Sequence, residues 1–463
     1  MIKLFFILLK ILTVVRLISY QLSFTQTIPT SFYDYKIKKY LHFFGKDWEN
    51  KSNIFQIRFD NNLLNDTINT KRSNIINQSS FHSYNDKKSI SHFSKMLFKN
   101  KVYIYLNAKI VNDISVFDNY TGLPRNKRRF GYYSGETDLS GIGFENEDFI
   151  IQFGRGRESL GTGQDMNLLI NSNSVSYDYG LFGINYNNIR LRYFHGFLEN
   201  INSVNRYING RSIEYSNKKS AIISLSEVVI YSGINRPLDI AYLNPIATHL
   251  EIELNNRQNV LGLSDANAVW QISHDWMINN NLRASHNFFI DELVIDNEER
   301  KTNKSHGLAF SSMYSYSSVY NKIKLTIFSK HKYIGTHAFR HGNGMNNFVS
   351  RDKVLGSKLG SDAQSIRLGV NLINEAGNLI SLDLGFNKLG EASIINNKYS
   401  AYEDHFKKTF PSGEITKFYD FNFNLVYFIA NKVSFDTEIK FDSRNHNEEK
   451  FMDKILFNLS YLW

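Results

Sequence analysis

The chain contains no cysteine and only 5 prolines in 463 residues. The absence of cysteine excludes disulfides, thiolate metal sites and the lipid-attachment cysteine of a lipoprotein. The low proline content suits long paired strands, because proline has no backbone N–H to offer a strand ladder. Beyond the N-terminus, no run of about 18 uncharged apolar residues occurs, which excludes membrane-spanning helices.

What the chain does contain is a period-two alternation of apolar and polar residues. In Tyr419–Tyr427 every odd position is aromatic or aliphatic, and the even positions are Asp, Asn, Asn and Val. Such a run forms a strand with one apolar and one polar face. Similar runs are Val102–Ile110, Phe149–Phe153, Ile323–Ile327, Ile366–Leu372, Ile380–Phe386, Val433–Phe441 and Ile455–Trp463. Several of them reach about 9 residues, a length that crosses a bilayer at a tilt.

These strands predict a membrane barrel, with a soluble β-sandwich as the alternative. A closed barrel satisfies every backbone group in lipid and needs only moderate hydrophobicity, such as the 42% found here. From Val102 onward, roughly 360 residues at about 20 residues per strand and connection give about 16–18 strands. We therefore predict an all-β fold, a transmembrane antiparallel β-barrel of about 16–18 strands with some N-terminal helical or plug segments.

Three parts are expected along the chain. Residues 1–20 resemble an export signal peptide, although two basic residues interrupt the apolar stretch; an amphipathic first helix is the alternative. Residues 21–100 are predicted to be a polar periplasmic or plug segment, partly helical, with Tyr35–Phe44 and Ile90–Phe98 as candidate helices. Residues 101–463 are predicted to form the outer-membrane β-barrel.

The last strand carries a further expectation. Ile455–Trp463 alternates up to its aromatic end, which is similar to the signal that outer-membrane barrels present to the barrel-insertion machinery. We expect this strand to close the barrel against the first strand after the polar N-terminal segment. The expected location is the outer membrane of a Gram-negative bacterium, with outer-membrane lipid and the insertion machinery as partners.

The chain is basic, with 54 Lys and Arg against 44 Asp and Glu and a formal charge of +10. This surplus predicts attraction to an acidic partner, such as lipopolysaccharide phosphate or an anionic polysaccharide. A solvated surface biased toward lysine is the alternative. The densest basic cluster is Arg125–Arg129. Because the strand pattern is that of an exported protein, no nucleic-acid partner is expected.

The sequence contains no motif for catalysis or for binding phosphate or metal. Gly154–Gly163 is rich in glycine but lacks the Gly-Lys-Ser/Thr ending of a phosphate-binding loop. The 13 histidines show no metal-ligand spacing. Nothing holds Glu227 and Asp239 at the separation of roughly 5–10 Å that glycoside hydrolysis requires. We expect a protein that is not an enzyme and has no cofactor or metal; an outer-membrane hydrolase is the weakest alternative.

A series of short motifs occurs in order between residues 140 and 270. They are Gly141–Phe144, Phe149–Arg155, Glu158–Gly163, Leu168–Asn173, Tyr177–Asp178, Arg192–Glu199, Arg206–Tyr207, Leu225–Glu227, Tyr231, Pro237–Pro245 and Asn259–Leu263. Pro237–Pro245 is the most specific of them. Their order and spacing resemble the Wzi family of capsule-assembly outer-membrane proteins. The sequence departs from the family pattern where Trp, Pro and Gly are usual, at Leu160, Thr162 and Ser226, and Ser174–Ser176 replaces a small-residue and proline turn.

The resemblance implies a monomeric barrel of about 18 strands with helical plug material. It also implies lectin-like binding, without catalysis, that anchors capsular polysaccharide or exopolysaccharide at the cell surface. A general diffusion porin is the alternative, because a barrel of this size with a polar lumen conducts without any special site.

The same stretch of sequence supplies the candidate polysaccharide-binding residues. Sugars are bound by bidentate arginine, by carboxylate and amide groups, and by aromatic faces. The candidates are Arg155, Arg157, Glu158, Asp178, His195, Arg206, Glu227, Arg236, Asp239 and Asn244. The alternative for each of them is a structural ion pair or hydrogen bond that holds the barrel wall or plug together.

Overall fold

The computed structural model describes residues 75–462 except 85–86, 99–100, 115–127, 134–136, 147, 162–165, 172–173, 218–219, 261–265, 280, 295–300, 302–304, 322, 375–377, 403–408, 431–432 and 444–453. The predicted signal peptide, the candidate helix Tyr35–Phe44 and most of the predicted polar segment therefore lie outside the described residues, as does Trp463. Within the described residues, no helix is both long and apolar enough to cross a bilayer.

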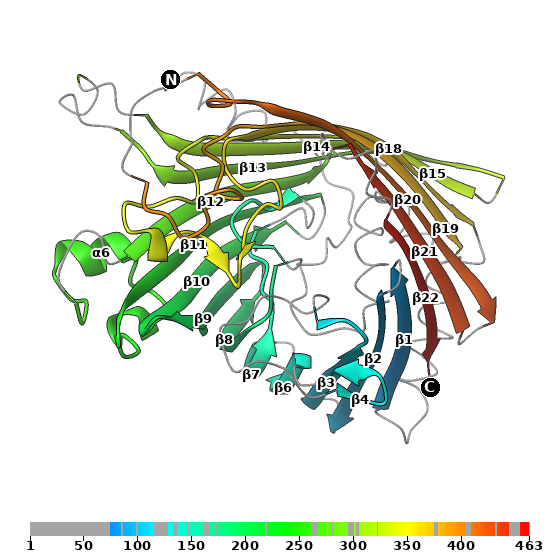
Figure 1. Ribbon diagram of the computed structural model, residues 1–463, viewed down its shortest axis with the longest axis horizontal. Coiled ribbons are helices and arrows are strands. Elements are labelled where there is room, and N and C mark those ends of the chain that lie inside the picture. The colour runs from blue at the N-terminus through cyan, green and yellow to red at the C-terminus, as the bar shows by residue number, and fades with distance from the viewer. Residues whose placement is uncertain are drawn as a thin grey trace.

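One antiparallel sheet closes on itself to form a barrel (Figure 1). Two of its 20 strands, β4 (Arg128–Arg129) and β5 (Tyr132–Tyr133), have two residues each, which leaves 18 long strands among the described residues. Each long strand pairs with the next, and the last one pairs with β1 from Gln78↔Leu462 to Ser83↔Phe457. The predicted all-β antiparallel barrel and the predicted range of strand number are confirmed.

The long strands are β1 (Ile75–Tyr84), β2 (Lys87–Phe98), β3 (Val102–Val111), β6 (Thr137–Glu145), β7 (Phe149–Gly156), β8 (Tyr177–Tyr186), β9 (Ile189–Ile201), β10 (Val204–Ser216), β11 (Ala221–Ile234), β12 (Ala266–Met277), β13 (Leu282–Glu292), β14 (Gly307–Tyr320), β15 (Ile323–Ile334), β18 (Ala363–Asn374), β19 (Leu379–Leu389), β20 (Thr416–Ala430), β21 (Val433–Asp442) and β22 (Lys454–Leu462). The remaining elements are η4 (Ala241–Leu243), α6 (His249–Leu254), η5 (Gly344–Asn346), β16 (Val349–Ser350) and β17 (Lys353–Val354). All eight alternating runs coincide with β3, β7, β15, β18, β19, β20, β21 and β22.

The connections divide sharply between the two ends of the barrel. At the end where β1 begins and β22 stops, here named the turn end, every connection has four residues or fewer. The opposite end, here named the loop end, carries all the long connections. They are residues 112–136, 157–176, 235–265, 293–306, 335–362, 390–415 and 443–453. The loop end is therefore the end of the barrel that has enough chain to build a binding site.

The strands expose apolar residues outward and bury polar residues inward. On β20, Tyr419 and Ile429 are exposed on the outer face, whereas Asn424 on the inner face is buried. The same division is seen on β18, where Leu368 is exposed and Asn371 is buried. Such alternation is typical of strands that contact lipid on one face and a polar lumen on the other. The predicted lipid face is present.

Loop-end connections fold into the lumen and pack against its wall. Residues 157–176, 335–362 and 390–402 contribute buried apolar side chains to a core that also includes inward-facing wall residues. Its members include Leu160, Leu168, Leu169, Ile170, Phe194, Ile208, Val269, Phe289, Phe339, Phe348, Leu355 and Ile394. The wall also binds the backbone of these loops, because the Gln271 side-chain oxygen accepts hydrogen bonds from the backbone N–H groups of Leu168 and Leu169, both at 3.0 Å. These connections form a plug.

Residues 75–98 correct two predictions. They form β1 and β2 of the barrel, so the wall begins before residue 101 and the helix predicted at Ile90–Phe98 is wrong. The physical reason is that the outward positions Asn77 and Ser79 of β1 are polar, which removes the alternation signal. Ser94 on β2 donates a 2.7 Å hydrogen bond to Asn77, and Ser79 lies 2.9 Å from the His92 ring nitrogen. Backbone pairing and these polar contacts hold the strand in place.

Candidate ligand-binding site

A polar patch interrupts the outer wall about midway along β11. On β11, Ile223 and Leu225 are exposed at outward positions, but the next outward residue, Glu227, is buried. Strand pairing places Arg211 of β10 and Trp270 of β12 on either side of Glu227. A buried charge on the outer face of a membrane barrel requires both partners and cover.

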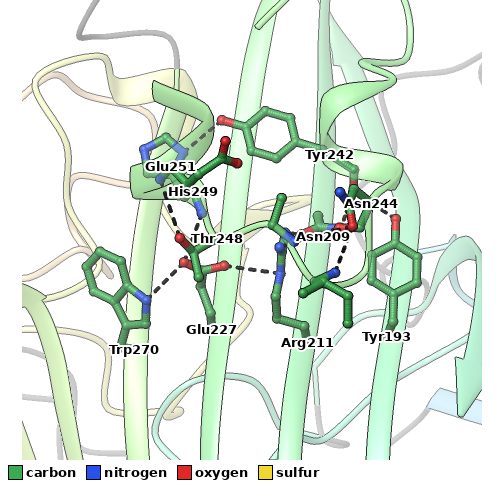
Figure 2. Close-up of polar contacts among 12 residues, drawn as sticks. Tyr193, Asn209, Arg211, Glu227, Tyr242, Asn244, Thr248, His249, Glu251 and Trp270 are labelled. Carbon is green, nitrogen blue, oxygen red and sulfur yellow. Dashed lines mark hydrogen bonds and ion pairs between the residues drawn. The ribbon is translucent and has the colours of Figure 1, made fainter. Parts of the chain in front are cut away.

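Glu227 has one ion-pair partner and two hydrogen-bond donors, each from a different element (Figure 2). Its carboxylate lies 3.1 Å from Arg211 Nε, and it accepts hydrogen bonds from Trp270 Nε1 at 2.9 Å and from the backbone N–H of His249 at 3.1 Å. Arg211 in turn donates to the Asn209 side-chain oxygen at 2.6 Å. The carboxylate therefore joins two wall strands to the segment that contains α6.

That segment, residues 235–260, is here named the outer loop, and it covers the patch from outside the barrel. Figure 1 shows α6 beside β10 and β11, away from the interior of the ring. Aromatic rings stack from the wall into the loop, with centroid distances of 4.9 Å for Tyr207–Tyr231, 4.7 Å for Tyr231–Tyr242 and 6.0 Å for Tyr242–His249. The three tyrosines belong to an apolar core separate from that of the plug. The stack seats the outer loop on the outer wall.

Local sequence explains how the outer loop holds its shape. Thr248 caps α6, because its side chain accepts a hydrogen bond from the backbone N–H of Glu251. At the base of the loop, the Arg236 guanidinium lies 3.0 Å from the Asp239 carboxylate and donates to the Asn259 side chain at 2.8 Å. Asp239 also accepts from the Asn259 backbone N–H at 2.9 Å. The two ends of the outer loop are thereby fastened together.

Five of the ten sequence candidates come together at the outer loop. They are His195, Glu227, Arg236, Asp239 and Asn244. His195 contacts the Tyr231 hydroxyl at 2.7 Å, and the Asn244 carbonyl accepts from Arg211 at 3.5 Å. Their contacts with one another and with the wall attach the outer loop to the barrel.

The other five candidates lie elsewhere. Arg155 and Asp178 form an ion pair at 3.0 Å between β7 and β8, and Arg157 is partly buried just beyond β7. Arg206 faces the lumen, where it pairs with Glu199 and donates to plug backbone carbonyls at 2.6 and 2.8 Å. The structure therefore divides the predicted set between the lumen and the outer wall.

Glu158 is fully buried in the lumen. Its carboxylate accepts a 2.7 Å hydrogen bond from the Tyr179 hydroxyl and lies 3.5 Å from an Arg192 nitrogen. Burial raises the pKa of Glu158 to about 7, although the nearby Arg192 charge acts in the opposite direction. At this position the Glu158 carboxyl group attaches the plug to β8 and β9.

A pocket lies at the loop end, between the outer loop and two plug connections. Its volume is about 420 Å³. The outer loop contributes His249 and Glu253, β12 contributes Trp270, and the connections 335–362 and 390–415 contribute His337, Arg340 and Tyr402. None of the ten sequence candidates lines this pocket.

The pocket combines aromatic, cationic and acidic groups. The Arg340 guanidinium lies 3.9 Å from the centre of the Tyr402 ring, and His337 contacts the same ring edge-on at 5.1 Å. Arg340 also donates to the Ala392 carbonyl at 2.6 Å, which fixes its position. Trp270 links this pocket to Glu227 through its indole N–H. Among the described residues, no group of three side chains has metal-binding geometry.

Sequence reasoning missed these pocket residues because they come from connections far apart in the chain. One signal was available for the patch beneath the outer loop. Glu227 has the same parity as Ile223 and Leu225, so the alternation itself places a carboxylate on the lipid face. A charge at such a position indicates that another part of the chain covers it.

The chain matches no protein-family model and no curated protein sequence. Its fold is similar to that of Wzi, described as an outer membrane protein of Escherichia coli involved in group 1 capsule assembly and as a carbohydrate-binding β-barrel. The TM-score is 0.61 at 11% identity, with 86% of each chain covered. Two other matches are a BenF-like porin from Pseudomonas fluorescens Pf-5 (TM-score 0.47, 10% identity, 85% of this chain and 98% of that one) and Pseudomonas aeruginosa OprD (0.44, 9%, 84% and 93%).

The chain is an outer-membrane β-barrel by fold, which agrees with the predicted location in the outer membrane of a Gram-negative bacterium. In such barrels the short turns face the periplasm and the long loops face the exterior. The loop end, and with it the pocket, is therefore the extracellular end.

Proposed function

We propose that this barrel binds a polysaccharide at the cell surface and anchors it there without catalysis. The observation that carries the proposal is the loop-end pocket of about 420 Å³, within the range of about 300–1,000 Å³ that is usual for small-ligand sites. Its mixture of aromatic faces, a guanidinium and carboxylates is the set of groups that binds sugars. The similar fold of Wzi, described as a carbohydrate-binding barrel, supports the proposal.

The pocket chemistry favours a neutral sugar unit over a strongly anionic one. Glu253 and Glu292 both line the pocket, against the single arginine Arg340. Carboxylates accept hydrogen bonds from sugar hydroxyl groups but repel a uronate or phosphate. The ligand we propose is therefore capsular polysaccharide or exopolysaccharide with at least one neutral residue exposed to the pocket.

The test measures binding of purified, lipid-reconstituted protein to polysaccharide from its own cell surface. We expect Tyr402→Ala and Arg340→Ala each to weaken binding at least about tenfold, equivalent to about 1.4 kcal/mol. Arg257→Ala is the matched control, because Arg257 is exposed on the outer loop, pairs with Glu251 and does not line the pocket. Unchanged binding in both pocket variants would contradict the proposed site.

Two further measurements address the ligand and the role. Binding to a neutral sugar unit should persist at high salt, because salt screens interactions between charges. Loss of binding at high salt would instead assign recognition to the basic surplus of the chain. A deletion strain that retains normal amounts of cell-bound polysaccharide would contradict the anchoring role.

A diffusion porin is the second candidate, and one observation favours it. On the lumen side of β18–β20, Arg367 forms ion pairs with both Asp383 and Asp420, so this part of the wall is polar and suited to water. Single-channel recording separates the two functions. A steady open pore supports the porin, whereas a barrel that does not conduct supports the anchor. A monomeric state and contacts with lipopolysaccharide and the insertion machinery remain predictions.

A further inference from the structure

The polar patch on the outer wall lies at the depth of the lipid belt. On β20 exposed apolar residues extend from Ile429, one residue from the turn end of the strand, to Tyr419, eleven residues from it. On β11 the exposed apolar residues that start at the turn end stop at Leu225, and the next one is Ile234, the last residue of the strand. The buried Glu227 lies only six residues from the turn end. Because the short turns mark one rim of the barrel, Glu227 lies at the level of the middle of the β20 belt.

The outer loop presents a new apolar surface over this gap. Its most exposed large apolar side chains are Ile240, Ile246, Leu250 and Leu254, with exposed fractions of 80, 77, 52 and 72%. In α6, Leu250 and Leu254 are four residues apart and form the exposed face, whereas His249 and Ile252 are buried. The helix therefore has one side toward the wall and another that is apolar and uncovered.

These two observations are complementary. The wall beneath the outer loop has lost its apolar belt, and the loop carries an apolar face in its place. The face continues the exposed apolar residues of the neighbouring wall, which include Ile213, Tyr215, Ile223 and Leu225. An uncovered apolar surface that continues a lipid belt is suited to the same environment.

We propose that the outer loop is seated in the outer leaflet of the membrane, with Ile240, Ile246, Leu250 and Leu254 against lipid acyl chains. Arg211, Glu227 and Trp270 then form a polar cluster at membrane depth that the outer loop separates from lipid. The loop also separates the acyl chains from the pocket, because His249 and Glu253 line the pocket while Leu250 and Leu254 contact lipid. This proposal is independent of the glycan that the pocket binds.

The absence of cysteine makes the test direct, since every introduced cysteine is unique. Single variants Leu254→Cys and Ile246→Cys carry a nitroxide label in protein reconstituted into phosphatidylcholine vesicles. Ile223→Cys is the lipid-facing reference, and Asp148→Cys, in the short turn between β6 and β7, is the aqueous reference. Accessibility to oxygen, which partitions into lipid, is compared with accessibility to a water-soluble nickel chelate.

We expect the labels at Leu254 and Ile246 to match the Ile223 reference, with several-fold lower nickel accessibility than at Asp148 and high oxygen accessibility. High nickel accessibility, as at Asp148, would place the loop in water and overturn the proposal. Low accessibility to both reagents would indicate a covering protein, such as a second copy of the chain, and would overturn it as well. Heat-modifiable mobility on a denaturing gel confirms that each labelled variant is a folded barrel.

Discussion

Among the buried Arg–Glu pairs of β9–β11, one on the inner face and one on the outer face hold different parts of the chain. Inside, Arg206 and Glu199 bind the plug, whose Arg351 backbone N–H and Tyr399 hydroxyl both donate to Glu199 at 3.0 Å. Outside, Arg211 and Glu227 bind the outer loop. The comparison shows that loops are attached to both surfaces of one wall by the same chemistry.

The two pairs differ in what surrounds them. The inner pair lies in a lumen that contains polar wall residues and plug backbone, which offer it many hydrogen-bond partners. The outer pair lies at the depth of the lipid belt, where Trp270 and Asn209 of the wall are its neighbours and the outer loop supplies a further partner and the cover. Since an unpaired buried charge is costly in either place, the attachment of each loop depends on its pair.

The largest effect is expected from breaking the inner pair. Glu199→Ala leaves the fully buried Arg206 without its carboxylate, so we expect the free energy of unfolding to fall by about 3–5 kcal/mol. Guanidinium unfolding followed by tryptophan fluorescence measures the change. The control is Glu251→Ala, which breaks the exposed pair with Arg257 and should cost less than about 1 kcal/mol. Equal losses in the two variants would contradict the role of the inner pair.

A smaller effect is expected on the outer face. Glu227→Ala removes the carboxylate that pairs with Arg211 and accepts hydrogen bonds from Trp270 and His249, but Arg211 keeps the Asn209 side chain at 2.6 Å. We expect a loss of about 2–3 kcal/mol, concentrated in the attachment of the outer loop. The rate of trypsin cleavage after Arg257 in the outer loop measures it. The double variant Arg211→Leu/Glu227→Leu should be cleaved more slowly than Glu227→Ala, because no unpaired charge remains; faster cleavage would contradict this account.

The smallest effect is a pH dependence on the lumen side. The pKa of Glu158 is raised from 4.5 to about 7, so the folded protein retains this proton when the unfolded chain has lost it. The free energy of unfolding should therefore fall as pH rises through this window, by roughly 2 kcal/mol between pH 5 and pH 8. Glu158→Gln, which preserves the acceptor for Tyr179, should show a shallower fall over the same range. Parallel profiles for the two proteins would rule out Glu158 as the source.

Much of the barrel could be predicted from the sequence, because period-two alternation directly reports which face of a strand meets lipid. The alternation did not predict β1, because its outward residues Asn77 and Ser79 are polar and pairing with the neighbouring strands holds it in place. It also could not place Glu199, since a register shift beside Arg206 turns this residue inward although Phe197, two residues earlier, is exposed. Strict alternation would have assigned Glu199 to the outer face together with Phe197.

The sequence predicted a cluster of polar residues but not the pocket, which none of the ten candidates lines. Five of the ten candidates meet at the outer loop, and all five come from a single stretch of the sequence. They are His195, Glu227, Arg236, Asp239 and Asn244. The pocket residues Trp270, Arg340 and Tyr402 were not predicted, because local sequence does not say which loop-end connections fold toward one another.

The sequence by itself determined the closed antiparallel barrel and its lipid face, since both follow from the short-range periodicity of side chains along each strand. Only the tertiary structure decided how the wall is used. Whether a charged residue such as Arg206 or Glu227 binds a ligand, the plug or the outer loop depends on where distant connections return to the wall. That choice is made by long-range packing and by the requirement that every buried charge find a partner.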